Sequence, residues 1–63
     1  MTAAEAYSNC VACGAKEPME FFLYLAGHAH ELRLENGSRL DDGTDFKAFL
    51  LEFALAAKVA VTV

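Results

Sequence analysis

The segment from residue 45 to residue 57 shows the clearest periodicity of apolar positions in the chain. Its apolar residues recur at helical spacing and form one stripe about 100° wide, made of Phe46, Phe49, Leu50, Phe53 and Ala57. Thr44 or Asp45 can accept hydrogen bonds from the free amides of a first helical turn. The pattern therefore predicts a main helix over about residues 45–57.

Two further leucines of the same segment, Leu51 and Leu55, lie almost opposite this stripe. One apolar stripe is enough to hold a surface helix on a core, so a second stripe predicts burial on a second side. In a chain of 63 residues, we expect that second side to face another protomer. The alternative is a pair of tolerated surface leucines.

Residues 28–35 alternate with a period of two, and the residues that share one face are His28, His30, Leu32 and Leu34. This alternation is typical of a half-buried strand. Asn36-Gly37 follows, and this pair favours the positive φ angles of a tight hairpin turn. The segment therefore predicts antiparallel strands joined by a hairpin at Asn36-Gly37.

The end of the sequence alternates in the same way, because Val59, Val61 and Val63 are separated by smaller or polar residues. We therefore expect a C-terminal strand, paired within a sheet or across a dimer interface. Together with the second leucine stripe, this makes the candidate oligomer interface Leu51, Leu55, Val59 and Val61.

The first third of the chain begins with a helix signal. Thr2 and Glu5 have the spacing of a capping box, so we expect a short helix from about Ala3, which Gly14 can end. Residues 19–26 are apolar and aromatic, and their periodicity does not separate a buried strand from a buried helix. Their aromatic content and shortness favour a strand, whereas Pro18 at a first turn favours a helix.

Taken together, these patterns predict a single domain over residues 1–63 with an α+β fold. Its parts are a short N-terminal helix or knuckle, antiparallel strands with the Asn36-Gly37 hairpin, one main helix, and a C-terminal strand. A domain of this size buries only about 60% of the surface of its unfolded chain. Small domains of this kind often need a metal, a disulfide or a partner subunit.

Composition strengthens the expectation of a partner. Apolar residues make up 56% of the chain, above the roughly 45–50% of an average soluble domain. No targeting segment is evident, and no apolar run approaches the ~20 residues of a membrane helix. We therefore expect a cytoplasmic protein that does not bind membranes, in a compartment where thiols stay reduced.

The net charge of −4 is unevenly distributed. Residues 31–45 hold two arginines and five carboxylates, namely Glu31, Glu35, Asp41, Asp42 and Asp45. Because no basic patch is present, direct binding to nucleic acid is not expected. The acidic stretch is either a solvated hairpin and loop or a surface that docks on a basic partner protein.

Cys10 and Cys13 are the two cysteines of the chain, and Gly14 follows the second. A turn with Cys-x-x-Cys-Gly resembles the knuckle of zinc ribbons and rubredoxin-like sites, where a second knuckle supplies two more ligands. No second knuckle is present. His28 and His30 would complete a Cys₂His₂ zinc site if both projected from one face of a strand.

Three other interpretations of the cysteines stay open. Two chains can each give Cys10 and Cys13 to one ion, the thiols can be small buried hydrophobes at the end of the first helix, or they can form a disulfide. Redox catalysis is disfavoured, because the predicted helix precedes the pair and its dipole acts in the wrong sense. Ser8 and Ser38 have no nucleophile motif around them.

We therefore predict a small, acidic, non-enzymatic interaction or regulatory protein that acts as a homo-oligomer. Like a phage- or plasmid-type inhibitor, it would occlude a basic site on a larger protein with a rigid acidic face. No cofactor is required by this function. The alternative is a zinc-stabilised module built on Cys10 and Cys13, with His28 and His30 or with a second chain.

Overall fold

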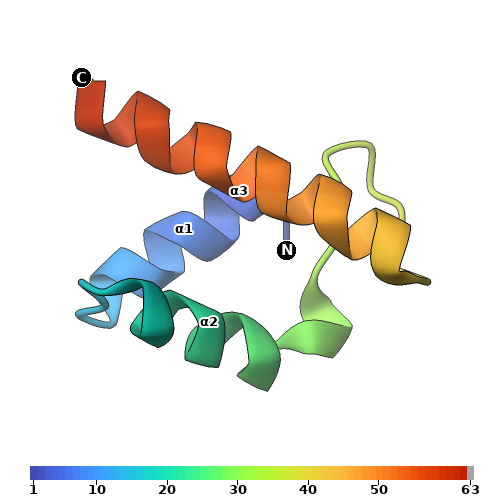
Figure 1. Cartoon of the computed structure of the whole chain (residues 1–63), viewed down its shortest axis with the longest axis horizontal. Helices are drawn as coiled ribbons and strands as arrows, with labels where there is room; N and C mark the ends of the chain where they lie inside the picture. The colour runs from blue at the N-terminus through green and yellow to red at the C-terminus, as the bar shows by residue number, and fades with distance from the viewer. Residues whose placement is uncertain (63) are drawn as a thin grey trace.

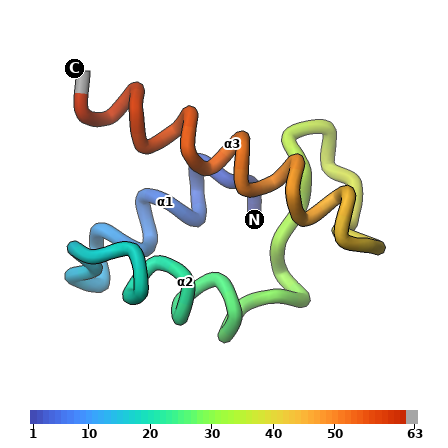
Figure 2. Tube along the Cα trace, in the orientation of Figure 1, coloured from blue at the N-terminus to red at the C-terminus, as the bar shows by residue number. Residues whose placement is uncertain are grey.

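The computed structural model describes residues 1–62, and it is helical throughout its regular parts. The elements are α1 (Ala3–Ala12), α2 (Pro18–Gly27), a short 3₁₀ turn η1 (Ala29–Glu31) and α3 (Gly43–Thr62). Helices α1 and α2 form a hairpin, and α3 packs along α1 (Figure 1). The chain trace shows the loop after η1 folding back beside the start of α3 (Figure 2).

Among residues 1–62 there is no sheet, so the predicted α+β fold with antiparallel strands is wrong. The one extended pairing in this part of the chain is an isolated antiparallel bridge between Arg33 and Arg39. None of the helices in the described range is both long enough and apolar enough to cross a bilayer.

Helix α1 confirms the N-terminal helix prediction at both ends. The Thr2 amide donates to Glu5 Oε1 over 2.9 Å, and the Glu5 amide donates to Thr2 Oγ1 over 3.4 Å, which is the reciprocal capping box. At the other end Gly14 has a φ of 89°. Its amide donates to the Val11 carbonyl, and the Ala15 amide donates to the Cys10 carbonyl. These two bonds form a Schellman motif, which satisfies the last carbonyls of the helix.

Helix α2 overturns the strand interpretation of residues 19–26. Pro18 occupies the first turn, where its missing N–H costs nothing. Glu20 Oε1 accepts hydrogen bonds from the amides of Lys16 and Glu17, over 3.2 and 3.0 Å. The segment contains leucine and methionine but no β-branched residue, so its side chains lose little freedom in a helix.

The predicted strand over residues 28–35 is also wrong. His28 ends α2, and His30 lies in η1, so the two imidazoles do not share a strand face. A turn does form here, but it is not the predicted two-residue turn with two positive φ angles. Gly37 has a φ of 90° and its amide donates to the Leu34 carbonyl, whereas Asn36 has no positive φ. The Leu34 amide donates to the Ser38 carbonyl over 2.8 Å. Pairing stops after one bridge, because no neighbouring strand extends it.

Helix α3 confirms the main helix but is longer than predicted at both ends. Asp42, rather than Thr44 or Asp45, caps it: Asp42 Oδ1 accepts from the amides of Thr44 and Asp45, over 2.8 and 3.0 Å. The helix continues to Thr62, so the predicted C-terminal strand is wrong over the described residues, and Val63 lies outside them. The segment before Thr62 is rich in alanine and holds no proline or glycine after Gly43, so nothing stops the helix.

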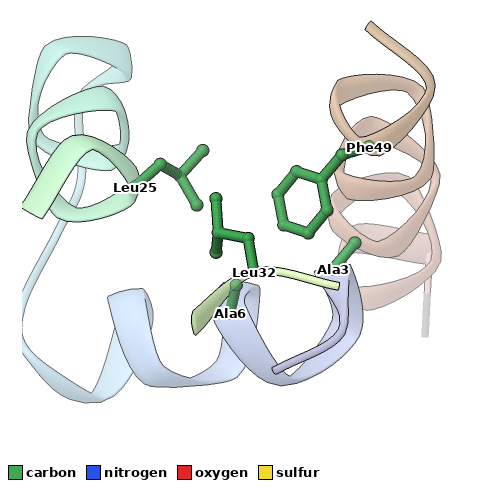
Figure 3. Close-up of a cluster of buried hydrophobic side chains, with 5 residues drawn as sticks. All are labelled: Ala3, Ala6, Leu25, Leu32 and Phe49. Carbon is green, nitrogen blue, oxygen red and sulfur yellow. The ribbon is translucent and has the colours of Figure 1, made fainter. Parts of the chain in front are cut away.

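The core is small and lies where the three helices meet the loop after η1. Figure 3 shows Phe49 of α3 and Leu25 of α2 pointing toward Leu32, with two alanines of α1 beneath them. These residues are buried: Ala3, Ala6, Leu25, Leu32 and Phe49. Half-buried rings of Tyr7, Phe21 and Phe53 extend this core, with centroids 5.7–5.9 Å apart. One ring from each helix therefore joins all three elements.

Candidate interaction surfaces

The four residues predicted for the oligomer interface are all exposed on α3. The exposed fractions of Leu51, Leu55, Val59 and Val61 are 65%, 62%, 60% and 80%. Leu51, Leu55 and Val59 are spaced four residues apart, so they form a row along one side of the helix. We call this row the α3 stripe. It lies on a helix rather than partly on a strand, and its role as an interface stays a prediction.

A groove of about 550 Å³ lies beside the α3 stripe, between the first half of α1 and the C-terminal half of α3. Leu55 and Val59 belong to both the stripe and the groove, and Ala4, Tyr7 and Ser8 line the α1 side. Glu52 and Glu35 also line the groove, and the Glu35 amide donates to Glu52 Oε1 over 3.1 Å. The α3 stripe is thus one wall of a hollow that apolar side chains can fill.

A second apolar surface, which sequence reasoning missed, lies on the outer side of α2. Met19, Phe22 and Leu23 are 66%, 52% and 66% exposed, and Ala26 lies among them. We call these four residues the α2 face. A helical reading of residues 18–27 separates them from Leu25 and Phe21, which point inward. The helical spacing of these residues in the sequence therefore indicates an exposed apolar face, whereas a strand buried on both sides would have none.

The solvent-accessible surface of the chain is larger than its mass predicts for a compact monomer. It exposes 4501 Å² for a mass of 6.8 kDa. The scaling of surface with mass gives about 4,000 Å² for a compact monomer of this size, so the excess is about 500 Å². The chain therefore exposes about an eighth more surface than an average compact monomer of its mass.

The acidic residues predicted to bind a partner have different roles in the structure. Asp42 caps α3, and Asp45 Oδ2 accepts from the Asp41 amide over 2.9 Å. The Glu31 carboxylate lies 2.5 Å from His28 Nδ1. Glu35 and Asp41 are exposed, and their carboxylates make no hydrogen bond within the described residues. These two therefore remain available for a basic partner, whereas the other three also hold the loop in place.

The imidazole ring of His28 contacts two neighbouring side chains. Its ring stacks on Tyr24 of the preceding helical turn, with centroids 4.3 Å apart, and Glu31 approaches from η1. His30 is exposed. In residues 1–62, no group of three or more His, Cys, Asp or Glu side chains comes together as a metal site would need.

The two cysteines also differ from each other. Cys10 is fully buried and Cys13 is exposed, and both are free thiols. Burial, and to a smaller extent the neighbouring Cys13, raises the pKa of the Cys10 thiol above its ordinary value. The Cys-x-x-Cys-Gly sequence is here the C-terminal end of a helix, with Gly14 supplying the left-handed residue. Zinc binding by these cysteines, through a second chain, stays a prediction.

Comparison with known proteins does not assign the chain to a family. No family model, no curated protein and no solved structure matches the chain. The surfaces described above are therefore the basis for a functional proposal.

Proposed function

We propose that the chain is a small, non-enzymatic, regulatory interaction protein that acts as a homo-oligomer and covers a surface of a partner protein. The observation that carries this proposal is the placement of large apolar side chains on exposed helix faces. More of them are exposed than buried among the described residues. Monomeric proteins rarely leave contiguous apolar patches uncovered, and larger patches mark interaction sites.

Self-association would use the α3 stripe and the groove beside it. Residues spaced four apart form a ridge, and such ridges from two helices interdigitate at a crossing angle of about −50°. Burying one leucine or valine side chain is worth about 1.5–3 kcal/mol. Leu51, Leu55 and Val59, contributed twice in a symmetric pair, would supply the apolar centre of such an interface.

Partner binding would use surfaces that this pairing leaves free. The α2 face offers apolar contacts, and Asp41 offers a carboxylate that no other described group holds. A partner surface with an apolar centre surrounded by basic side chains would complement the α2 face and this carboxylate. The protein would act by occlusion, covering the partner surface that these groups contact.

Light scattering coupled to size exclusion tests the oligomer. At tens of micromolar, wild-type protein is expected to have at least twice the chain mass. Leu55→Glu is expected to shift most of the protein to monomer, because it places a charge at the centre of the buried patch. Leu23→Glu on the α2 face is the matched control, since its exposure is similar, and it should keep the wild-type mass.

The outcome against this proposal is a wild-type protein that stays monomeric at these concentrations. An equal loss of mass in Leu55→Glu and Leu23→Glu would also contradict it, because the effect would then not be specific to the α3 stripe. Helical circular dichroism of each variant shows that its fold is retained.

A further inference from the structure

A small polar hollow of about 190 Å³ lies between η1 and the Arg33–Arg39 bridge. Four of the residues that line it carry polar side chains: His30, Arg33, Arg39 and Asp41. A single water takes about 30 Å³ of liquid volume, so the hollow has room for a tetrahedral oxyanion. It lies apart from the α3 stripe and the α2 face.

The two arginines face each other across the antiparallel bridge. Residues directly opposite in such a pair project to the same side of the ribbon, and like charges in this position are destabilising. Neither guanidinium has a carboxylate within ion-pair distance in residues 1–62. The two arginines therefore project to the same side of the ribbon, and neither forms an ion pair within residues 1–62.

Arg33 is also fixed in place before any ligand arrives. Its Nη1 donates to the carbonyls of His30 and Leu32, over 3.0 and 2.8 Å. These bonds anchor the guanidinium at the wall of the hollow and leave its other N–H donors unused. The Arg39 guanidinium makes no hydrogen bond within the described residues. A planar fork of N–H donors is suited to the oxygens of a phosphate.

Among residues 1–62, Asp41 is the one acidic residue that lines the hollow. Its carboxylate only accepts hydrogen bonds when ionised. A fully deprotonated anion such as sulfate meets repulsion there, whereas a hydrogen phosphate ion has an O–H that can donate to Asp41. We propose that this hollow is a binding site for inorganic phosphate in a protonated form. Arg33 and Arg39 hold its oxygens, and Asp41 accepts its O–H.

Titration of ¹⁵N-labelled protein with sodium phosphate at constant ionic strength, followed in ¹H–¹⁵N spectra, tests the site. The amides of residues 29–41 are expected to shift to saturation, while those of the α2 face stay in place. Sodium sulfate in a parallel titration should bind at least fivefold more weakly. Shifts that never saturate, or that occur equally with sulfate, would overturn the proposal.

Substitutions of the lining residues test which side chains bind the phosphate. Arg39→Ala is expected to weaken phosphate binding at least tenfold, and Arg39→Lys should retain part of it because the charge remains without the planar fork. Lys47→Ala is the matched control, because it changes the net charge equally on exposed α3 surface. Asp41→Asn should remove the preference for phosphate over sulfate.

Two results would count against the assignment: unchanged binding in Arg39→Ala, or an equal loss in Lys47→Ala. Dispersed spectra of each variant show that it is folded. The native mass should not change in Arg39→Ala, so this site and the proposed oligomer stand or fall separately.

Discussion

At the scale of single residues, Gly14 gives the Cys-x-x-Cys-Gly sequence a structural role at the end of a helix, and zinc binding by its cysteines stays a prediction. Gly14 has a φ of 89°, a conformation that side chains rarely adopt, and it ends α1 with the Schellman bonds. Cys10 lies four residues earlier and points into the interior, and Cys13 is the exposed capping residue. A glycine that ends a helix and a glycine in a zinc knuckle can both directly follow the second cysteine in the sequence. Spacing alone did not separate them.

The difference between the thiols is directly measurable. Cys13 is expected to react quickly with a maleimide or disulfide reagent at neutral pH, and Cys10 roughly tenfold or more slowly, because it is buried and its pKa is raised. Because the shift is upward, the Cys10 rate should keep rising at pH values above those at which an ordinary cysteine is ionised. Cys13→Ser should leave only the slow reaction. Two equally fast thiols would contradict the burial of Cys10.

At the scale of elements, capping and turn motifs predicted the ends of α1 and the position of the turn at Gly37 correctly, whereas short alternations of apolar and polar residues did not predict the structure. The capping box at Thr2 and Glu5, the stop at Gly14 and the turn at Gly37 all form where the sequence indicates them. Each is settled by a few neighbouring residues. The strand predictions were wrong because an alternation over a few residues forms a strand only where a second strand pairs with it, and the described residues pair only at one bridge. Pro18 was the informative residue for α2.

The capping box predicts a specific pH dependence. Hydrogen bonds from the backbone and then the hydroxyl of Thr2 hold the pKa of Glu5 below its ordinary value. A lowered folded-state pKa stabilises the fold above the unfolded-state pKa, and this stabilisation is lost as pH falls through the folded value. The melting temperature of Glu5→Gln should therefore lie below that of the wild type at pH 7 and approach it near pH 3.

Glu35→Gln is the control for this experiment, because the Glu35 carboxylate has no hydrogen-bond partner in the described chain. Its difference from the wild type should be small at both pH values. A Glu5→Gln difference that persists unchanged at low pH would show that the charge of Glu5 does not contribute.

At the scale of the whole molecule, the core is too small to account for the apolar content of the chain. Of the described large apolar side chains, Phe49, Leu32 and Leu25 are buried, whereas the α3 stripe and the α2 face are exposed. The sequence predicted this in part: Leu51 and Leu55, opposite the main stripe of α3, are exposed, but Phe46, which was expected to face the core, is 40% exposed as well. It did not predict the α2 face, because that required knowing that residues 18–27 are helical.

The stability of a self-associating protein depends on its concentration. We expect the melting temperature of the wild type to rise across a hundredfold increase in protein concentration, and that of Leu55→Glu to stay constant. Phe49→Ala should lower stability by about 3–5 kcal/mol, because it empties the centre of the core. It serves as a reference for loss of the fold itself. A wild-type melting temperature independent of concentration would argue against self-association.

Helices α2 and α3 face each other across the core, so their outer sides point in opposite directions (Figure 3). If α3 pairs with its copy, each α2 face points away from the contact, and the assembly carries two identical binding surfaces. Two linked surfaces bind a target with repeated sites more tightly than either alone, by about 10²–10⁴-fold where the geometry lets both engage. The protein would then distinguish assembled or repetitive targets from single subunits by valency, with no change in the chemistry of either surface.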